Sequence, residues 1–408
     1  AGIAQVAQVL PSWSSMTVAE GLEIAEPAAQ RAMTLAPDSG EANLALAMVM
    51  DKPESMPQYE KAVDMLPNHS MALAWYANQF QGPAGPNWNT ALDLLRKAVE
   101  LDPLSPHLRS QLARQLLIMN RWEEAIEQLH IVQNTNPDFA SARGFMSWAT
   151  GASGNFDESV IWSARYFELD PNTGFASMPM LQSLAELKDR DRLVRIRDEW
   201  AEVGEQDEAV RAAEMLIATV DGRYDAALEI DATMGGGPGY RPGIERAWLH
   251  TYRRDYAEAI AQWRKIAPSL FDDTQRAFAL RRNSDIGCVV ADALRRQGEQ
   301  GQADDLVKDL MAYATEELPR YQNHTEWVAN LAYCHAYLGD FEAALDQLES
   351  NFRHRHFFFW WQNRALELFD PLQGDPRYES IMQAFEDEMS RQRASLDRLE
   401  QAERTAGT

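Results

Sequence analysis

Two histidines stand close together near the end of the chain, in FRHRHFFFWW (352–361). His354 and His356 are of a residue type that binds metals, but side chains two positions apart point to different faces of a helix. Arg353 and Arg355 lie next to them and disfavour a cation, and the nearest upstream carboxylate is Glu349. We therefore predict no metal site here.

Two further patterns resemble chemical sites but are better explained by structure. GGGPGYRPG (235–243) follows an expected helix and lacks the Lys and Ser/Thr of a phosphate-binding loop, so we predict a turn. Cys288 and Cys334 fall on first helices of neighbouring units, at positions about a turn and a half apart along the helix axes. We therefore expect no disulfide between them, and we expect Cys334 to be a small core residue.

The composition excludes several classes of function. Lys and Arg total 38 against 62 Asp and Glu, giving a net charge of −24, so we predict no binding of nucleic acid. The longest apolar runs, Leu44–Met50 and Phe357–Trp361, are too short to insert across a membrane. No Ser–His–Asp, Cys–His or paired-carboxylate arrangement stands out, so we predict neither enzymatic activity nor a cofactor.

A repeating unit organises the first part of the chain. Amphipathic stretches end in prolines at intervals of 30, 36, 34 and 34 residues, at Pro37, Pro67, Pro103, Pro137 and Pro171. The clearest unit runs from Pro106 to Pro137, with small or apolar residues at the places where two helices would cross. A 34-residue period that ends in Pro is typical of the tetratricopeptide repeat (TPR).

The same helix–turn–helix pattern continues with looser spacing in TVDGRYDAALEI (219–230), TYRRDYAEAIAQW (251–263) and AYLGDFEAALDQL (336–348). No stretch alternates with a period of two, so we assign no sheet. The sequence thus predicts an all-α, right-handed superhelical solenoid of roughly eight or nine TPR-like helix pairs.

Three segments are expected along this solenoid. Residues 1–171 would hold regular repeats and residues 172–350 degenerate, TPR-like repeats. Residues 351–408 would hold an aromatic plug, formed by Phe357, Phe359 and Trp360, and a C-terminal capping helix at Glu379–Arg404. A solenoid needs such a cap with a polar outer face to remain soluble.

Both ends of the repeat region resemble a more specific family. Residues 10–49 look like the start, and LELFDPLQGDPRYESIM (366–382) is similar to the end, of the TPR region in bacterial membrane-anchored winged-helix regulators and TPR-bearing nucleotide cyclases. The resemblance implies a sensory or interaction region without its output domain. Ala1–Leu10 reads as the remnant of a first helix, which favours an excised segment, although a free-standing TPR protein is the alternative.

The resemblance also implies a binding groove, because the first helix of each TPR pair lines the concave side. The side chains expected there are Arg114, Trp148, Arg241, Trp248, Tyr252, Arg295, Arg296, Tyr333 and Tyr337. Trp, Tyr and Arg often anchor protein interfaces, so a peptide with apolar anchors and some acidic groups would suit this lining. Alternatively, several of these aromatic side chains pack between helices. The Lys and Asn pairs of a chaperone-tail clamp are absent.

The leading hypothesis is a non-catalytic TPR module that binds a protein or peptide in its groove, as the sensory or scaffolding region of a bacterial signalling or transcription-regulatory protein. One alternative is a small-molecule sensor with a ligand between repeats, near Trp148 or near Trp248 and Tyr252. Another is a homodimer formed through the exposed aromatic cluster at 357–361. The winged-helix resemblance implies a periplasmic location and the cyclase resemblance a cytoplasmic one, so the compartment is left open.

Overall fold

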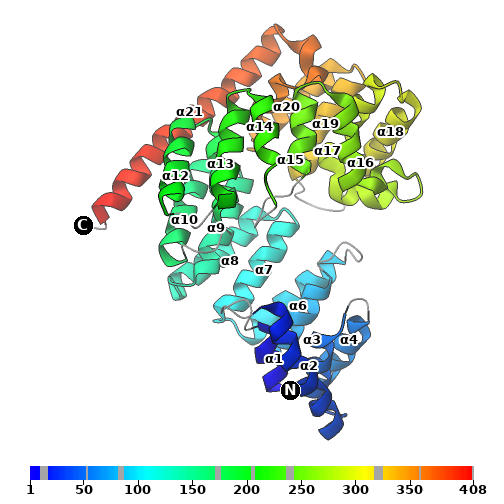
Figure 1. Cartoon of the computed structure of the whole chain (residues 1–408), viewed down its shortest axis with the longest axis vertical. Coiled ribbons are helices and arrows are strands. Elements are labelled where there is room, and N and C mark those ends of the chain that lie inside the picture. The colour runs from blue at the N-terminus through cyan, green and yellow to red at the C-terminus, as the bar shows by residue number, and fades with distance from the viewer. Residues whose placement is uncertain are drawn as a thin grey trace. The chain divides into compact units, whose positions relative to one another are not determined.

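The computed structural model describes residues 1–9, 17–51, 54–80, 87–170, 176–203, 207–235, 243–316, 325–357 and 360–406 (Figure 1). Every regular element in these ranges is helical. The all-α solenoid expected from the repeat period is therefore confirmed. In the described ranges α1 to α20 form ten consecutive helix pairs, slightly more than the eight or nine expected.

Helix starts follow from local sequence. Thr17 and Glu20 form a reciprocal capping box, in which each side chain accepts a hydrogen bond from the backbone N–H of the other residue. Ser105 caps the helix Pro106–Ile118 by accepting from the Leu108 N–H, and Pro106 occupies the first turn of that helix. Proline is favoured there because an N–H in the first turn of a helix has no partner within the helix.

The chain divides into two compact units, and the division falls within one helix, α8. Unit 1 comprises residues 1–119 and 127–139, and unit 2 comprises residues 120–126 and 140–408. The helices up to the division are α1 (Gly2–Val9), α2 (Val18–Leu35), α3 (Gly40–Val49), α4 (Ser55–Met65), α5 (Ser70–Gln79), α6 (Trp88–Leu101), α7 (Pro106–Ile118) and α8 (Trp122–Thr135).

Unit 2 holds the looser repeats and the C-terminal region. Its repeat helices are α9 (Ala140–Ala152), α10 (Phe156–Leu169), α11 (Ser177–Glu186), α12 (Arg190–Val203), α13 (Asp207–Val220), α14 (Tyr224–Asp231), α15 (Ile244–Tyr252), α16 (Tyr256–Ile266), α17 (Arg276–Arg296), α18 (Gln300–Glu316), α19 (Thr325–Tyr337) and α20 (Phe341–Arg353). Three short 3-10 helices and a long helix complete it: η3 (Pro268–Phe271), η5 (Trp360–Arg364), η6 (Glu367–Leu372) and α21 (Pro376–Ala406).

First helices of several successive pairs lie side by side. Within unit 1, α1 contacts α3 and α5 contacts α7; within unit 2, α9 contacts α11, α11 contacts α13 and α17 contacts α19. One face of each unit is therefore a layer of first helices, and the second helices lie behind it. We call this layer the first-helix face.

Small side chains allow the helices to approach closely where the sequence predicted it. A Cβ added to Gly151 of α9 would lie 3.0 Å from the Ser159 hydroxyl of α10 and 3.3 Å from that of Ser183 in α11. The Ser147 and Ser163 hydroxyls are 2.6 Å apart in the same buried contact. Each hydroxyl thus finds a hydrogen-bond partner without the space that a larger side chain would need.

The capping helix at the C-terminus is present as α21, and it packs on both α20 and α10. Near its start, Arg377 pairs with Asp346 and Glu349 of α20. Further along, Gln392 accepts a hydrogen bond from the Phe156 N–H at the start of α10. Arg192 of α12 pairs with Glu400 of α21. The helix therefore joins the last repeat of unit 2 to its first repeats.

The expectation that Cys288 and Cys334 stay apart is wrong. They form a disulfide between α17 and α19, with their Cα atoms 5.2 Å apart. The expectation assumed that neighbouring first helices are alike in length and height, whereas α17 has 21 residues and α19 has 13. This difference changes which residues of the two helices lie opposite each other. Both cysteines are fully buried, as expected for Cys334.

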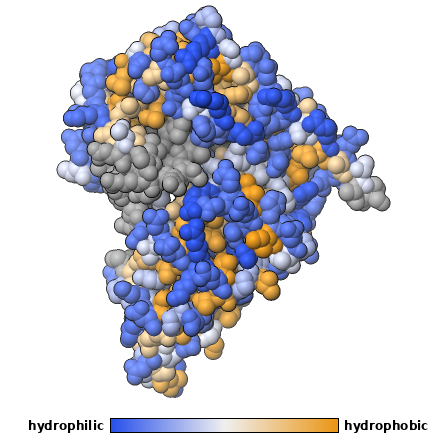
Figure 2. Space-filling view, turned by 180° about the vertical axis from the view of Figure 1, so that it is seen from behind, coloured by the Kyte–Doolittle hydropathy of each residue, from blue (hydrophilic) through white to orange (hydrophobic). Residues whose placement is uncertain are grey.

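The surface is mostly hydrophilic on the face drawn in Figure 2, in keeping with the net charge of −24. Some exposed apolar side chains recur with the repeat: Leu35, Met65, Leu101 and Leu169 each stand two positions before a repeat-closing proline. In the described parts of the chain, no helix is both long and apolar enough to cross a membrane.

Candidate functional site

Part of the first-helix face of unit 2 is covered by the chain itself. The residues between α20 and α21, which we call the C-terminal segment (354–375, of which 358 and 359 lie outside the described residues), return across α11, α15, α17 and α19. The Trp360 indole N–H donates to the Glu186 carbonyl at the end of α11, at 3.0 Å. The Trp361 ring lies 6.3 Å from that of Tyr252 in α15.

Charged and polar contacts hold the same segment further along. Glu367 of η6 accepts a hydrogen bond from the Tyr256 hydroxyl at 2.5 Å and pairs with Arg296 of α17 at 2.6 Å. Asp370 pairs with Arg254, in the turn after α15, at 2.9 Å. These contacts join the segment to α16, to α17 and to the turn after α15. The Glu367–Arg296 pair is partly buried and is therefore screened less than an exposed pair.

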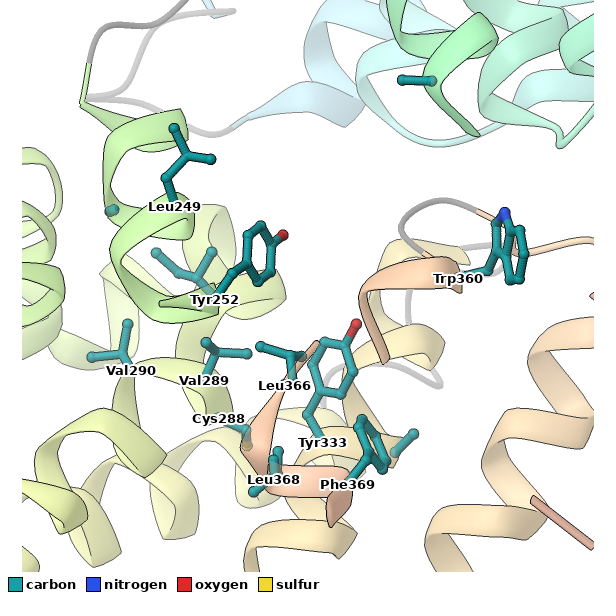
Figure 3. Packing of buried hydrophobic residues seen from close by; sticks show 14 of the residues in the cluster. Leu249, Tyr252, Cys288, Val289, Val290, Tyr333, Trp360, Leu366, Leu368 and Phe369 are labelled. Atoms are coloured by element: carbon teal, nitrogen blue, oxygen red, sulfur yellow. The ribbon is translucent and has the colours of Figure 1, made fainter. Parts of the chain in front are cut away.

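Two tyrosines expected in the groove lie beneath this segment. Tyr252 and Tyr333 are 6% and 7% exposed, and they belong to one hydrophobic cluster with Leu366 and Phe369 of the C-terminal segment (Figure 3). The Tyr333 hydroxyl donates to the Asn363 side chain at 3.1 Å. Burial raises the pKa of Tyr252 well above its ordinary value.

Neighbouring groove candidates are also engaged within unit 2. Arg295 lies over the Tyr337 ring, 4.3 Å from its centroid, and both Arg295 and Arg296 pair with Asp292. The Tyr337 hydroxyl bonds to Asp304 at 2.8 Å, and burial followed by this bond raises the pKa of Tyr337 above its ordinary range. These side chains connect α17, α18 and α19.

The remaining candidates of unit 2 differ in exposure. Trp148 of α9 is 37% exposed, which makes it one of the large apolar side chains that unit 2 presents to solvent. Trp248 of α15 is half-buried and stacks on Tyr252, with ring centroids 5.7 Å apart. Arg241 lies outside the described residues, as does Phe359 of the expected plug.

Unit 1 places a partly buried cation on its own first-helix face. Arg114 is the ninth residue of α7, and Asn78 is the ninth residue of α5, the neighbouring first helix. The Arg114 guanidinium donates to the Asn78 side-chain oxygen at 3.1 Å and to Gln111 at 3.2 Å. Burial lowers the pKa of Arg114, and burial together with the Arg114 charge lowers the pKa of His107.

The structure therefore gathers Tyr252, Arg296 and Tyr333 around the C-terminal segment, whereas Arg114 belongs to unit 1.

Asn78 was not predicted from the sequence as a residue of the groove. It stands at the repeat position of Arg114, one unit earlier, so extending the register backwards by one repeat would have found it. Among the described residues, no group of three or more His, Cys, Asp or Glu side chains is placed to hold a metal ion.

Comparison with known proteins supports the repeat assignment over part of the chain. Residues 87–149 match the family model described as tetratricopeptide repeat. No curated protein matches the sequence.

Several solved structures are similar to this one. They include YrrB, described as a TPR protein with an unusual peptide-binding site, at 16% identity and a TM-score of 0.33, covering 50% of this chain and 98% of YrrB. The pilF protein of Pseudomonas aeruginosa has 17% identity and a TM-score of 0.39, covering 50% and 91%. Human IFIT1, solved as a dimer with m7Gppp-AAAA, has 14% identity and a TM-score of 0.39, covering 86% and 80%.

Proposed function

We propose that this chain is a non-catalytic protein-interaction module, and that the first-helix face of unit 1 binds a protein segment bearing acidic groups. The observation that carries the proposal is the Arg114–Asn78 pair at equivalent positions of neighbouring first helices. A planar guanidinium held by neutral amides can donate to a carboxylate with two N–H groups at once.

The contrast between the two units supports this location. In unit 2 the C-terminal segment already contacts α11, α15, α17 and α19. A partner of that face would have to displace buried side chains such as Phe369 and Leu366. Displacing even one buried large apolar side chain costs about 2 kcal/mol, so unit 1 is the favoured binding surface.

The charge of the chain limits what an acidic partner can be. A net charge of −24 repels an acidic peptide at long range, but that repulsion is screened beyond about 8 Å at physiological salt. The partly buried Arg114 is screened much less. We therefore expect few acidic groups, placed beside apolar anchors, and an affinity that does not fall steeply as salt rises. Trp148 is retained as a candidate anchor on unit 2.

The wider context is proposed from the resemblance at 10–49 and 366–382. By this resemblance, the chain would be the sensory or scaffolding region of a bacterial signalling or transcription-regulatory protein. A protein partner bound to unit 1 would then be the input that the attached output domain responds to.

A peptide selection tests the binding proposal directly. Random peptides are selected on the full chain, and the affinity of the labelled consensus peptide is measured for the wild type, Arg114→Gln and Arg31→Gln. Arg31 is an exposed arginine on a second helix of unit 1 and serves as the matched control. We expect an acidic consensus and a loss of about 2 kcal/mol in Arg114→Gln alone. A neutral or basic consensus, or equal affinities for all three proteins, contradicts the proposal.

A further inference from the structure

Three aromatic rings from three separate parts of unit 2 surround the ring of Tyr252. Tyr224 opens α14, Trp248 and Tyr252 lie on α15, and Trp361 belongs to η5 of the C-terminal segment. The ring centroids of Tyr224, Trp248 and Trp361 lie 5.5, 5.7 and 6.3 Å from that of Tyr252. We call these four residues the Tyr252 cluster. The outer three rings are half-buried, so parts of them face solvent.

Two polar atoms of the Tyr252 cluster, one on Tyr252 and one on Trp361, lack partners. The Tyr252 hydroxyl is buried and has no hydrogen-bond partner among the described residues, and the same holds for the Trp361 indole nitrogen. The nearby Tyr333 hydroxyl, by contrast, bonds to Asn363. Buried hydroxyl and indole groups are almost always paired, and an unpaired one marks a place for a bound molecule or an ordered water.

Two carboxylates act on Tyr252. Besides burial and the phenols of Tyr333 and Tyr224, the carboxylates of Glu186 and Glu245 contribute to the raised pKa of Tyr252. Glu186 is buried and Glu245 is half-buried. Carboxylates at this place repel an anionic ligand and attract a cationic one. Aromatic faces act in the same direction, since a cation over a ring is attracted by its quadrupole.

We infer that the Tyr252 cluster binds an organic ammonium ion, with the cation against the aromatic faces and within reach of the Glu186 and Glu245 charges. The Tyr252 hydroxyl then hydrogen-bonds to a polar group carried by the same ligand. Because Trp361 comes from the C-terminal segment, the site is complete only while that segment lies across α15. The inference is independent of partner binding by unit 1.

Choline is a suitable probe, because 3,3-dimethylbutan-1-ol has the same shape and hydroxyl without the charge. Titration calorimetry on the full chain compares the two compounds for the wild type, Trp361→Leu and Glu245→Gln. We expect choline to bind the wild type at millimolar concentrations and the neutral alcohol to bind about ten-fold more weakly. Both variants should lose choline affinity by a similar factor.

Trp200→Leu is the matched control, since Trp200 contacts Phe167 elsewhere in unit 2, with ring centroids 5.8 Å apart. It should bind choline as the wild type does. Circular dichroism confirms that each variant is folded, and Glu245→Gln keeps the test valid if Trp361→Leu loosens the C-terminal segment. No choline binding by the wild type, equal affinity for the neutral alcohol, or unchanged affinity in both variants overturns the inference.

Discussion

Replacing Gly154 with alanine should disturb the closure of unit 2 far more than the same change at an equivalent turn. Gly154 lies between α9 and α10 with φ +78°, a conformation that costs alanine about 1 kcal/mol. An added Cβ would also overlap the Arg355 carbonyl oxygen of the C-terminal segment and lie 2.9 Å from the Phe357 ring. Relieving such overpacking costs a further 1–3 kcal/mol or so, giving about 2–4 kcal/mol in total.

Gly222 provides a matched control within the same unit. It occupies the turn between α13 and α14 with φ +71°, and a Cβ added there meets no atom within 4 Å. Gly222→Ala should therefore lose only the backbone contribution of about 1 kcal/mol. The difference between the two variants isolates the contact with the C-terminal segment.

Urea denaturation of each variant, followed by far-ultraviolet circular dichroism, measures the two free energies of unfolding. Hydrogen exchange of the backbone amides around Gln392 adds a local measurement, because the Gln392 side chain donates to the Gly154 carbonyl at 2.8 Å. We expect faster exchange around residues 354–357 and 388–396 in Gly154→Ala alone. Equal losses of stability and unchanged exchange in both variants would refute the packing of the C-terminal segment against the α9–α10 turn.

Three further outcomes follow from other contacts. Reducing the Cys288–Cys334 disulfide, which spans 46 residues, should lower the stability of unit 2 by up to about 4 kcal/mol, measured by urea denaturation with and without reductant. Burial, and then the charge of a neighbouring histidine, lowers the pKa of His356 from 6.5 to about 4. The free energy of unfolding should therefore fall as the pH drops from 6.5 to 4, and it should fall less in His356→Asn. Arg192→Met should cost up to about 3 kcal/mol, because partly buried carboxylates such as Glu400 lose their partner.

Each of these outcomes has its own control. Thiols that titrate in the untreated native protein would show that the cysteines are not joined. An unchanged slope of stability between pH 6.5 and 4 in His356→Asn would place the titrating group elsewhere. Arg398→Met alters an exposed arginine of α21, so a loss equal to that of Arg192→Met would contradict the role of the ion pairs between α12 and α21.

The fold could be predicted because local sequence patterns determine the repeat. Proline ends each regular second helix, and small residues such as Gly151 and Ser159 stand where the helices cross. These signals act within some 34 residues, so they appear as a period. The charged surface of α21 was an equally local signal, although the helix begins at Pro376, before the expected Glu379.

The arrangement of unit 2 could not be predicted, because it depends on contacts between distant positions. Tyr256 and Glu367 are 111 positions apart, and nothing in either local sequence marks the pair. The disulfide escaped prediction for a related reason. The position of α17 along α19 depends on the lengths of the two helices and on how α18 packs. The repeat register of the regular units was applied to these helices, and it placed Cys288 and Cys334 too far apart.

Hydrogen exchange of the full chain with and without the selected acidic peptide tests the central claim, that partners bind the first-helix face of unit 1 while the C-terminal segment covers that of unit 2. We predict that the peptide slows exchange in α5 and α7, around Asn78 and Arg114, and leaves α15, α19 and the C-terminal segment unchanged. Slower exchange in α15 and α19, together with faster exchange in the C-terminal segment, would contradict it. That result would show that the peptide displaces the segment and binds unit 2.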